Sequence, residues 1–173
     1  MKCLSRTLAM SLLVAMSITA SADNLLKDTT FSEDGGWGFW VNDPVVNAGG
    51  SGTLADGKAV AKSPALDKQN HSNIQLIKNI DVDADKSYKV KFKANSDKAG
   101  PLTVTYLLSK APYTGYADTI INIEPGEKVY ECILAVKKDK DGKLDTPRSL
   151  RMFFGAFKDA TVTVSDISFE EVK

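Results

Sequence analysis

Short runs in which apolar and polar residues alternate dominate this sequence and most constrain its fold. The clearest run, residues 88–94, reads Tyr-Lys-Val-Lys-Phe-Lys-Ala, and a period of two is that of a strand with one buried face. Turn signals such as Asp56-Gly57 separate the runs. Further β-branched or aromatic runs occupy residues 74–82, 102–108, 119–123, 128–136, 150–154 and 161–169, with a looser run at 37–46.

About ten short strands with such turns between them predict an all-β fold, namely an antiparallel two-sheet jelly-roll β-sandwich. No stretch after residue 22 keeps a helical period for more than a few residues, which argues against a βαβ fold. No internal repeat or linker is visible, so we expect a single domain over residues 23–173.

The first 22 residues have the pattern of a secretory signal peptide. Lys2 and Arg6 precede an apolar run at residues 8–18 that is too short to span a bilayer. Small residues at 20–22 then supply a cleavage site, which predicts a mature start at Asp23. We therefore expect a secreted or periplasmic protein that does not associate with a membrane after cleavage.

Charge and cysteine content exclude several classes of partner. The chain has 22 basic and 22 acidic residues, and removal of the leader, which contains two of the basic ones, leaves a net charge of −2. Such a chain has no electrostatic reason to bind nucleic acid or an anionic membrane. Cys132 is the only cysteine outside the leader, so no intramolecular disulfide is expected, and its strand-like surroundings predict a small buried thiol.

Catalytic constellations are scarce. His71 is the only histidine and lies in a polar loop, where a solvated side chain is the expected state. No nucleophile elbow, phosphate loop or cysteine–histidine metal spacing occurs. Residues 139–145 lack the ligand spacing of an EF-hand and predict a hairpin turn instead. We expect no enzymatic activity, although two carboxylates from distant strands could still form a glycosidase site.

Three blocks, in a fixed order, carry a resemblance to a known family. They are residues 36–40 (Gly-Trp-Gly-Phe-Trp), residues 111–113 (Ala-Pro-Tyr) and residues 150–157 (Leu-Arg-Met-Phe-Phe-Gly-Ala-Phe). With these blocks in this order, the chain resembles the family 4/9 carbohydrate-binding modules over nearly all of residues 23–173. That family belongs to the galactose-binding-like jelly rolls. The resemblance implies two antiparallel sheets, one of which curves into an open cleft for a glycan chain.

The resemblance also implies which residues line such a cleft. Trp40 and Tyr113 match the aromatic residues at its two sides. Phe153 matches a floor position where family members often carry an amide or arginine. Arg151 and Gln75 are close enough to take over some polar contacts, and strand register decides whether they do. The other floor positions are Lys78, Thr103, Ser109 and Ser149.

The remaining aromatic residues have competing interpretations. Trp37 stands at a strand entry beside glycines and is expected in the core. Tyr116 follows Tyr113 in the same loop, where it could bind ligand or pack inside. The alternating patterns place four others in the core, namely Tyr88, Phe92, Phe154 and Phe169.

The family commonly holds a structural calcium ion between its N-terminal segment and a late aspartate. Asp166 fits the late position, whereas Ser32 stands where an acidic residue often follows the phenylalanine. The resemblance thus implies a calcium site with one expected ligand replaced, and no other cofactor.

These observations predict non-catalytic binding of a polysaccharide or oligosaccharide, of the β-glucan or xylan type, in a cleft flanked by aromatic rings. A separate glycoside hydrolase is a possible partner. Two alternatives stay open: a structural or adhesive envelope protein that uses the jelly roll for protein contacts, and a small glycan-processing enzyme.

Overall fold

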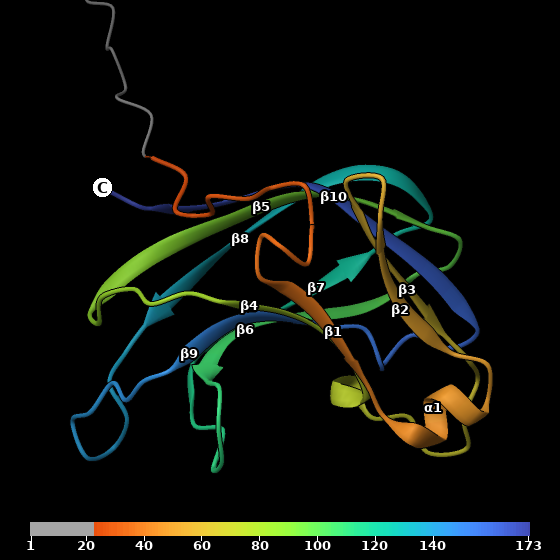
Figure 1. The fold of residues 1–173 in the computed structure, drawn as a ribbon, viewed down its shortest axis with the longest axis horizontal. Coiled ribbons are helices and arrows are strands. Elements are labelled where there is room, and N and C mark those ends of the chain that lie inside the picture. Colours follow the sequence, from red (N-terminus) through yellow and green to blue (C-terminus); the bar gives the residue numbers. More distant parts are fainter. Residues whose placement is uncertain (1–22) are drawn as a thin grey trace, which may run out of the picture.

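The structure is a computed structural model that describes residues 23–173, so the leader and its cleavage site lie outside the described residues. Within this range two five-stranded sheets pack face to face (Figure 1). The strands are β1 (Trp37–Val41), β2 (Ser51–Ala55), β3 (Lys58–Ser63), β4 (Ile74–Asn79), β5 (Lys86–Ser96), β6 (Gly100–Leu108), β7 (Gly115–Ile123), β8 (Gly126–Val136), β9 (Arg148–Phe153) and β10 (Ala160–Glu171).

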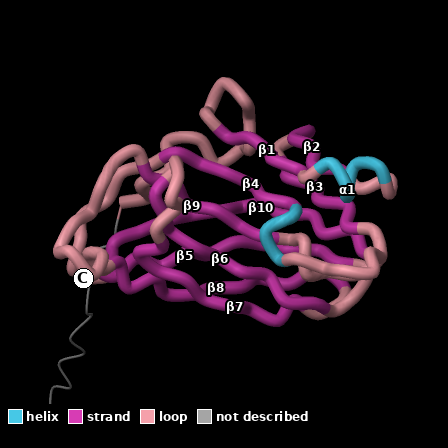
Figure 2. Tube along the Cα trace, turned by 90° about the horizontal axis from the view of Figure 1, so that it is seen from below, coloured by secondary structure: helices cyan, strands magenta, loops and turns pink. Residues whose placement is uncertain are grey.

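Every pair of neighbouring strands is antiparallel. One sheet, called the front sheet below, has the order β1-β4-β9-β6-β7, and the other, the back sheet, has the order β2-β3-β10-β5-β8. Figure 2 shows that strands make up most of the trace and that the two short helices lie in connections between them. The sequence-based prediction of an antiparallel two-sheet sandwich is therefore confirmed.

Alternation along the strands explains the core. In β6 the side chains of Leu102, Val104 and Tyr106 are fully buried between the sheets, so the residues between them must point to the outer face of the front sheet. Trp37 packs in the core as predicted, with its ring centroid 4.8 Å from that of Phe31.

The run at residues 37–46 differs from its prediction. Strand β1 ends at Val41, and residues Asp43–Asn47 form the short helix α1. Pro44 explains the change, because its fixed φ suits the first turn of a helix and it cannot donate to a strand ladder. A second helical turn, η1 (His71–Asn73), precedes β4. Among the described residues no helix is long and apolar enough to cross a membrane.

Strands β2 and β3 were not individually predicted. They form a hairpin whose turn residues, Asp56 and Gly57, both have positive φ, 52° and 73°. That conformation matches a type I′ turn, for which the Asp-Gly pair is a favoured sequence.

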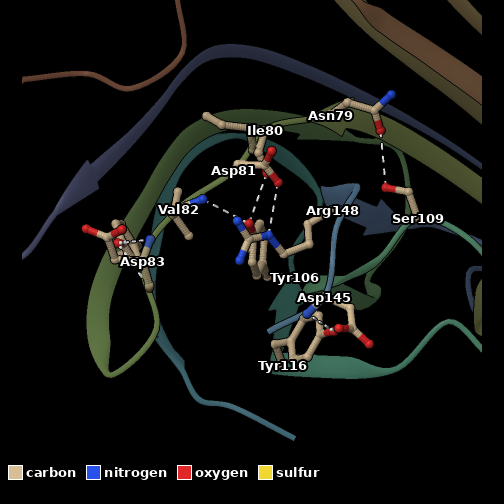
Figure 3. Close-up of polar contacts among 11 residues, drawn as sticks. Asn79, Ile80, Asp81, Val82, Asp83, Tyr106, Ser109, Tyr116, Asp145 and Arg148 are labelled. Atoms are coloured by element: carbon tan, nitrogen blue, oxygen red, sulfur yellow. Dashed lines mark hydrogen bonds and ion pairs between the residues drawn. The ribbon is translucent and has the colours of Figure 1, made fainter. Parts of the chain in front are cut away.

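A polar cluster fixes the start of β9 (Figure 3). The Nε of Arg148 donates to the Asp81 carboxylate at 2.9 Å, and its guanidinium lies 6.0 Å from the Tyr106 ring centroid. The Tyr106 hydroxyl donates to the Ile80 carbonyl at 2.9 Å and accepts from the Val82 amide at 3.0 Å. These contacts join the connection between β4 and β5 to β6 and to the first residue of β9.

Candidate functional site

Strand register brings the predicted site residues together on the outer face of the front sheet. Trp40 of β1 stands opposite Gln75 of β4, Gln75 stands opposite Phe153 of β9, and Phe153 stands opposite Thr103 of β6. Residues opposite each other in antiparallel strands share a face. One row across four strands therefore carries an indole, an amide, a phenyl ring and a hydroxyl.

A second row runs beside the first. Arg151 of β9 lies between Ile77 of β4 and Thr105 of β6, and Thr105 in turn pairs with Asp118 of β7. Side chains two residues apart on one strand point the same way, so Arg151 and Phe153 are neighbours on this face.

The members of these rows on β1, β4 and β9 form the floor of an open cleft of about 520 Å³. Trp40 and Tyr113 both border it, and their side chains remain 46% and 56% exposed. The cleft is lined by Trp40, Ser72, Gln75, Ile77, Leu107, Ser109, Tyr113, Arg151 and Phe153.

The loop between β6 and β7 presents Tyr113. In Figure 1 this loop projects from the front sheet on the side away from the back sheet. Its backbone is closed by bonds from the Leu108 amide to the Thr114 carbonyl and from the Tyr113 amide to the Lys110 carbonyl, at 2.9 and 2.8 Å. Tyr113 itself has a φ of 57°, a region that bulky side chains rarely adopt. The loop thus holds an exposed ring in a strained conformation, a feature that often marks a functional position.

Arg151 is held on the floor by neutral partners. Its Nε donates to the Ser149 hydroxyl at 2.9 Å and its Nη1 to the Gln75 side-chain carbonyl at 2.7 Å. The guanidinium carbon lies 5.6 Å from the Tyr113 ring centroid, within cation–π range. Burial lowers the pKa of Arg151 from its ordinary value, although the group stays protonated.

The two predicted serine positions have different roles. Ser149 is fully buried and supports Arg151 from below, so it is not among the residues that line the cleft. Ser109 lines the cleft at its end and donates to the Asn79 side-chain oxygen at 3.3 Å (Figure 3). Thr103 lies on the same face beside Phe153, beyond the lining.

Two predicted site residues lie elsewhere. Lys78 is in phase with the buried residues Ile74 and Leu76, so it points to the inner face of β4, where its ammonium lies 5.7 Å from the Trp37 ring centroid and bonds the Gly35 carbonyl. Its prediction as a floor residue was wrong.

Tyr116 also lies inside the protein. It is only 5% exposed, and its hydroxyl accepts the Asp145 amide at 3.0 Å (Figure 3). Its ring centroid lies 6.4 Å from that of Tyr106. The predicted role of Tyr116 in binding is therefore replaced by one in the core.

The residues around Asp166 do not fit a calcium site. Calcium takes six to eight oxygen ligands, yet the Asp166 carboxylate pairs with the Lys93 ammonium at 3.0 Å, which also lowers its pKa. Within residues 23–173 no group of three or more His, Cys, Asp or Glu residues could hold a metal ion.

Residues 139–145 form a turn, in which the Asp139 carboxylate accepts hydrogen bonds from the backbone amides of Asp141 and Lys143.

Sequence reasoning missed three residues of the lining: Ser72, Ile77 and Leu107. Ile77 and Leu107 lie an even number of residues from Gln75 and Thr103 on the same strands, so they share the cleft face. The sequence predicts this once it is known which alternate positions are buried in the core. The lining contains no Asp or Glu, so it offers no pair of carboxylates of the kind that glycosidases use.

Comparison with solved structures shows the same fold in several sugar-binding domains. A CBM4 carbohydrate-binding module is 19% identical, with 79% of this chain and 86% of that chain covered and a TM-score of 0.61. The second N-terminal cellulose-binding domain of β-1,4-glucanase C from Cellulomonas fimi is 18% identical, with coverage of 90% and 98% and a TM-score of 0.61. The first such domain of that enzyme is 14% identical, with coverage of 88% and 99% and a TM-score of 0.59.

No protein-family model and no curated protein matches this sequence. At these identities the likeness concerns the arrangement of strands. The chain has the jelly-roll fold of carbohydrate-binding modules.

Proposed function

We propose that this protein binds a single polysaccharide chain, of the β-glucan or xylan type, in the cleft of the front sheet and does not act on it chemically. The observation that carries the proposal is the placement of Trp40 and Tyr113 on one open cleft, each with about half of its side chain exposed. The fold that it shares with cellulose-binding domains supports the same reading.

Stacking supplies most of the binding energy. A pyranose ring has an apolar face of C–H groups that an aromatic ring can cover. A Trp side chain that is 46% exposed offers on the order of 100 Å² of surface. Covering about 60–100 Å² contributes about 1.5–2.5 kcal/mol at about 25 cal/mol per Å². Two such stacks with a few hydrogen bonds, less the cost of association, give dissociation constants of about 10⁻⁴ to 10⁻⁶ M.

The polar lining suits the rim of the same sugar. Gln75, Ser72 and Ser109 carry amide and hydroxyl groups that can replace the water around equatorial hydroxyls. The cleft is concave and has a volume of about 520 Å³, which fits a single glycan chain better than the flat face of a crystalline polysaccharide.

Affinity electrophoresis in gels that contain soluble β-glucans, xylans, mannans or galactans tests the proposal. The wild-type protein should be retarded in at least one glucan or xylan gel. Trp40→Ala and Tyr113→Ala should each weaken binding about 10- to 70-fold, since each removes one stack. Both residues are exposed, so the melting temperature should change by less than about 2 °C.

Ile133→Ala is the matched control, because Ile133 is 48% exposed but lies on β8 of the back sheet. It should leave retardation unchanged. The proposal fails if no gel retards the wild-type protein, or if the control weakens binding as much as the two cleft variants do.

The proposal includes export of the protein and action beside a separate glycoside hydrolase. N-terminal sequencing of the protein from the host's periplasm or medium should then start at Asp23. A start at Met1 would contradict export by signal cleavage.

A further inference from the structure

Arg151 gives the cleft a positive charge that nothing in its lining balances. It is the one charged residue among the nine that border the cleft. It is also only 8% exposed, so its guanidinium has lost most of its contact with water. A buried cation is costly unless an opposite charge or several hydrogen bonds compensate it.

The partners of Arg151 compensate this charge only in part. Ser149 and Gln75 are neutral acceptors, and the Tyr113 ring adds a weak attraction. Among the described residues no carboxylate lies within 4.0 Å of the guanidinium. By contrast Arg148, which is equally buried, donates to the Asp81 carboxylate at 2.9 Å.

Arg151 also keeps hydrogen-bond donors for a ligand. A guanidinium has five N–H groups, and one each donates to Ser149 and Gln75. The remaining three have no acceptor among the described residues. The Nη2 nitrogen carries two of these three N–H groups and is not a buried atom without a partner, so water and ligands can reach it from the cleft.

We propose that the sugar unit seated over Arg151 carries a carboxylate, so that the cleft takes a chain containing uronic acid. This inference rests on the proposed function and narrows its ligand class. A planar carboxylate matches the fork of a guanidinium in two parallel hydrogen bonds, whereas a sugar hydroxyl supplies one neutral acceptor.

The surrounding charges permit this ligand. Asp118 lies in the same row but two strands away from Arg151, roughly 10 Å at normal strand spacing. Salt largely screens repulsion between exposed charges at that distance. Lys110 belongs to the exposed loop that carries Tyr113, so it adds positive charge near the cleft.

Calorimetric titration of the wild-type protein with matched polymers tests the inference directly. The probes are glucuronic-acid-substituted xylan and polygalacturonate, each compared with the same polymer after reduction of its carboxyl groups. At least one acidic polymer should bind about tenfold or more tightly than its reduced form, because hydrogen bonds to a charged group are stronger than neutral ones. Sulfated xylan is the third arm and should bind more weakly than that acidic polymer.

Variants of Arg151 provide an independent readout. Arg151→Gln should weaken binding of the acidic polymer about 10- to 100-fold and binding of the reduced polymer less than about fivefold. Arg151→Lys keeps the charge without the fork and should fall between the wild type and Arg151→Gln. Circular dichroism confirms that each variant is folded before titration.

The outcomes separate the two proposals. Equal or tighter binding of both reduced polymers overturns the uronate inference and leaves the glycan cleft intact. Tighter binding of the sulfated polymer also overturns it, because the ligand group would then be a sulfate. Failure of every acidic and neutral polymer to bind removes both proposals.

Discussion

Replacement of Gly155 by alanine tests how the fold builds one end of the cleft. Gly155 follows β9, and its amide donates to the His71 carbonyl of η1 at 2.9 Å. A Cβ at this position would lie 2.8 Å from the Asn73 amide nitrogen and nearer still to the Asn70 carbonyl oxygen. Both are backbone atoms, so η1 would have to move as a unit.

The cost follows from this overlap. Overpacking of a tight site costs about 1–3 kcal/mol, and a weakened amide hydrogen bond adds about 1 kcal/mol. The two effects together cost about 2–4 kcal/mol. For a domain of this size each kcal/mol lowers the melting temperature by about 2–4 °C, so a drop of roughly 4–16 °C is expected. Ser72 belongs to η1 and lines the cleft, so glycan affinity should fall as well.

Thermal unfolding followed by circular dichroism measures the effect. Gly115→Ala is the control, because a Cβ there meets no atom within 4 Å. The control should melt within about 1 °C of the wild type. A Gly155→Ala variant that melts and binds like this control would refute the claim that the close approach of β9 and η1 shapes the cleft.

Three further predictions concern residues outside the cleft. Hydrogen bonds from Thr30 and Ser32 lower the pKa of Asp28, so its ionised carboxylate stabilises the fold above the unfolded pKa and this stabilisation is lost as pH falls. Asp28→Asn should therefore melt below the wild type at pH 7, and this difference in melting temperature should shrink between about pH 5 and pH 2. Burial raises the pKa of the Cys132 thiol to about 11, so a thiol reagent at pH 8 should react far more slowly with the native protein than with protein in denaturant, and equal rates would contradict this. Tyr106→Phe removes the acceptor of the buried Val82 amide and should cost about 1–3 kcal/mol by denaturant unfolding, whereas no loss would mean that water replaces the hydroxyl.

The alternating pattern predicted most of the strands because the buried and exposed positions of the folded sheets follow the same alternation. The run at residues 88–94 lies within β5, where Tyr88, Val90 and Phe92 are buried as their period requires. Strands β2 and β3 escaped prediction because they are short and contain Gly, Ala and Lys residues with weak strand preference. Gly52 reads as a turn residue, yet in the structure its missing side chain leaves room for the Phe39 ring.

The candidate site was predictable to the extent that strand phase determines it. Trp40, Phe153 and Arg151 lie on the cleft face in keeping with the resemblance. The error at Lys78 could have been avoided, because it shares its phase with Ile74 and Leu76. For Tyr116 the sequence left binding and packing inside both open, because its burial depends on contacts with Tyr106 and Asp145 that only the fold creates.

The two outer faces of the sandwich differ in a way that favours ligand binding over structural adhesion. On the back sheet the exposed Val129 and Ile133 are separated by Glu131, which stands opposite Lys91 in the next strand. A mixture of apolar and charged side chains of this kind is normal for a sheet face in contact with water.

The front sheet departs from that rule. Trp40, Ile77, Leu107 and Phe153 all line one concave face, in contact with a buried arginine. Leu107 and Phe153 are themselves buried, so Trp40 supplies the most exposed apolar surface among these four residues. An exposed aromatic ring beside a concave apolar floor is a common feature of ligand sites. The apolar side chains lie in a trough that Trp40 and Tyr113 border and that also carries polar groups. This shape supports the proposed ligand, because a polysaccharide is a slender chain with apolar faces and a polar rim.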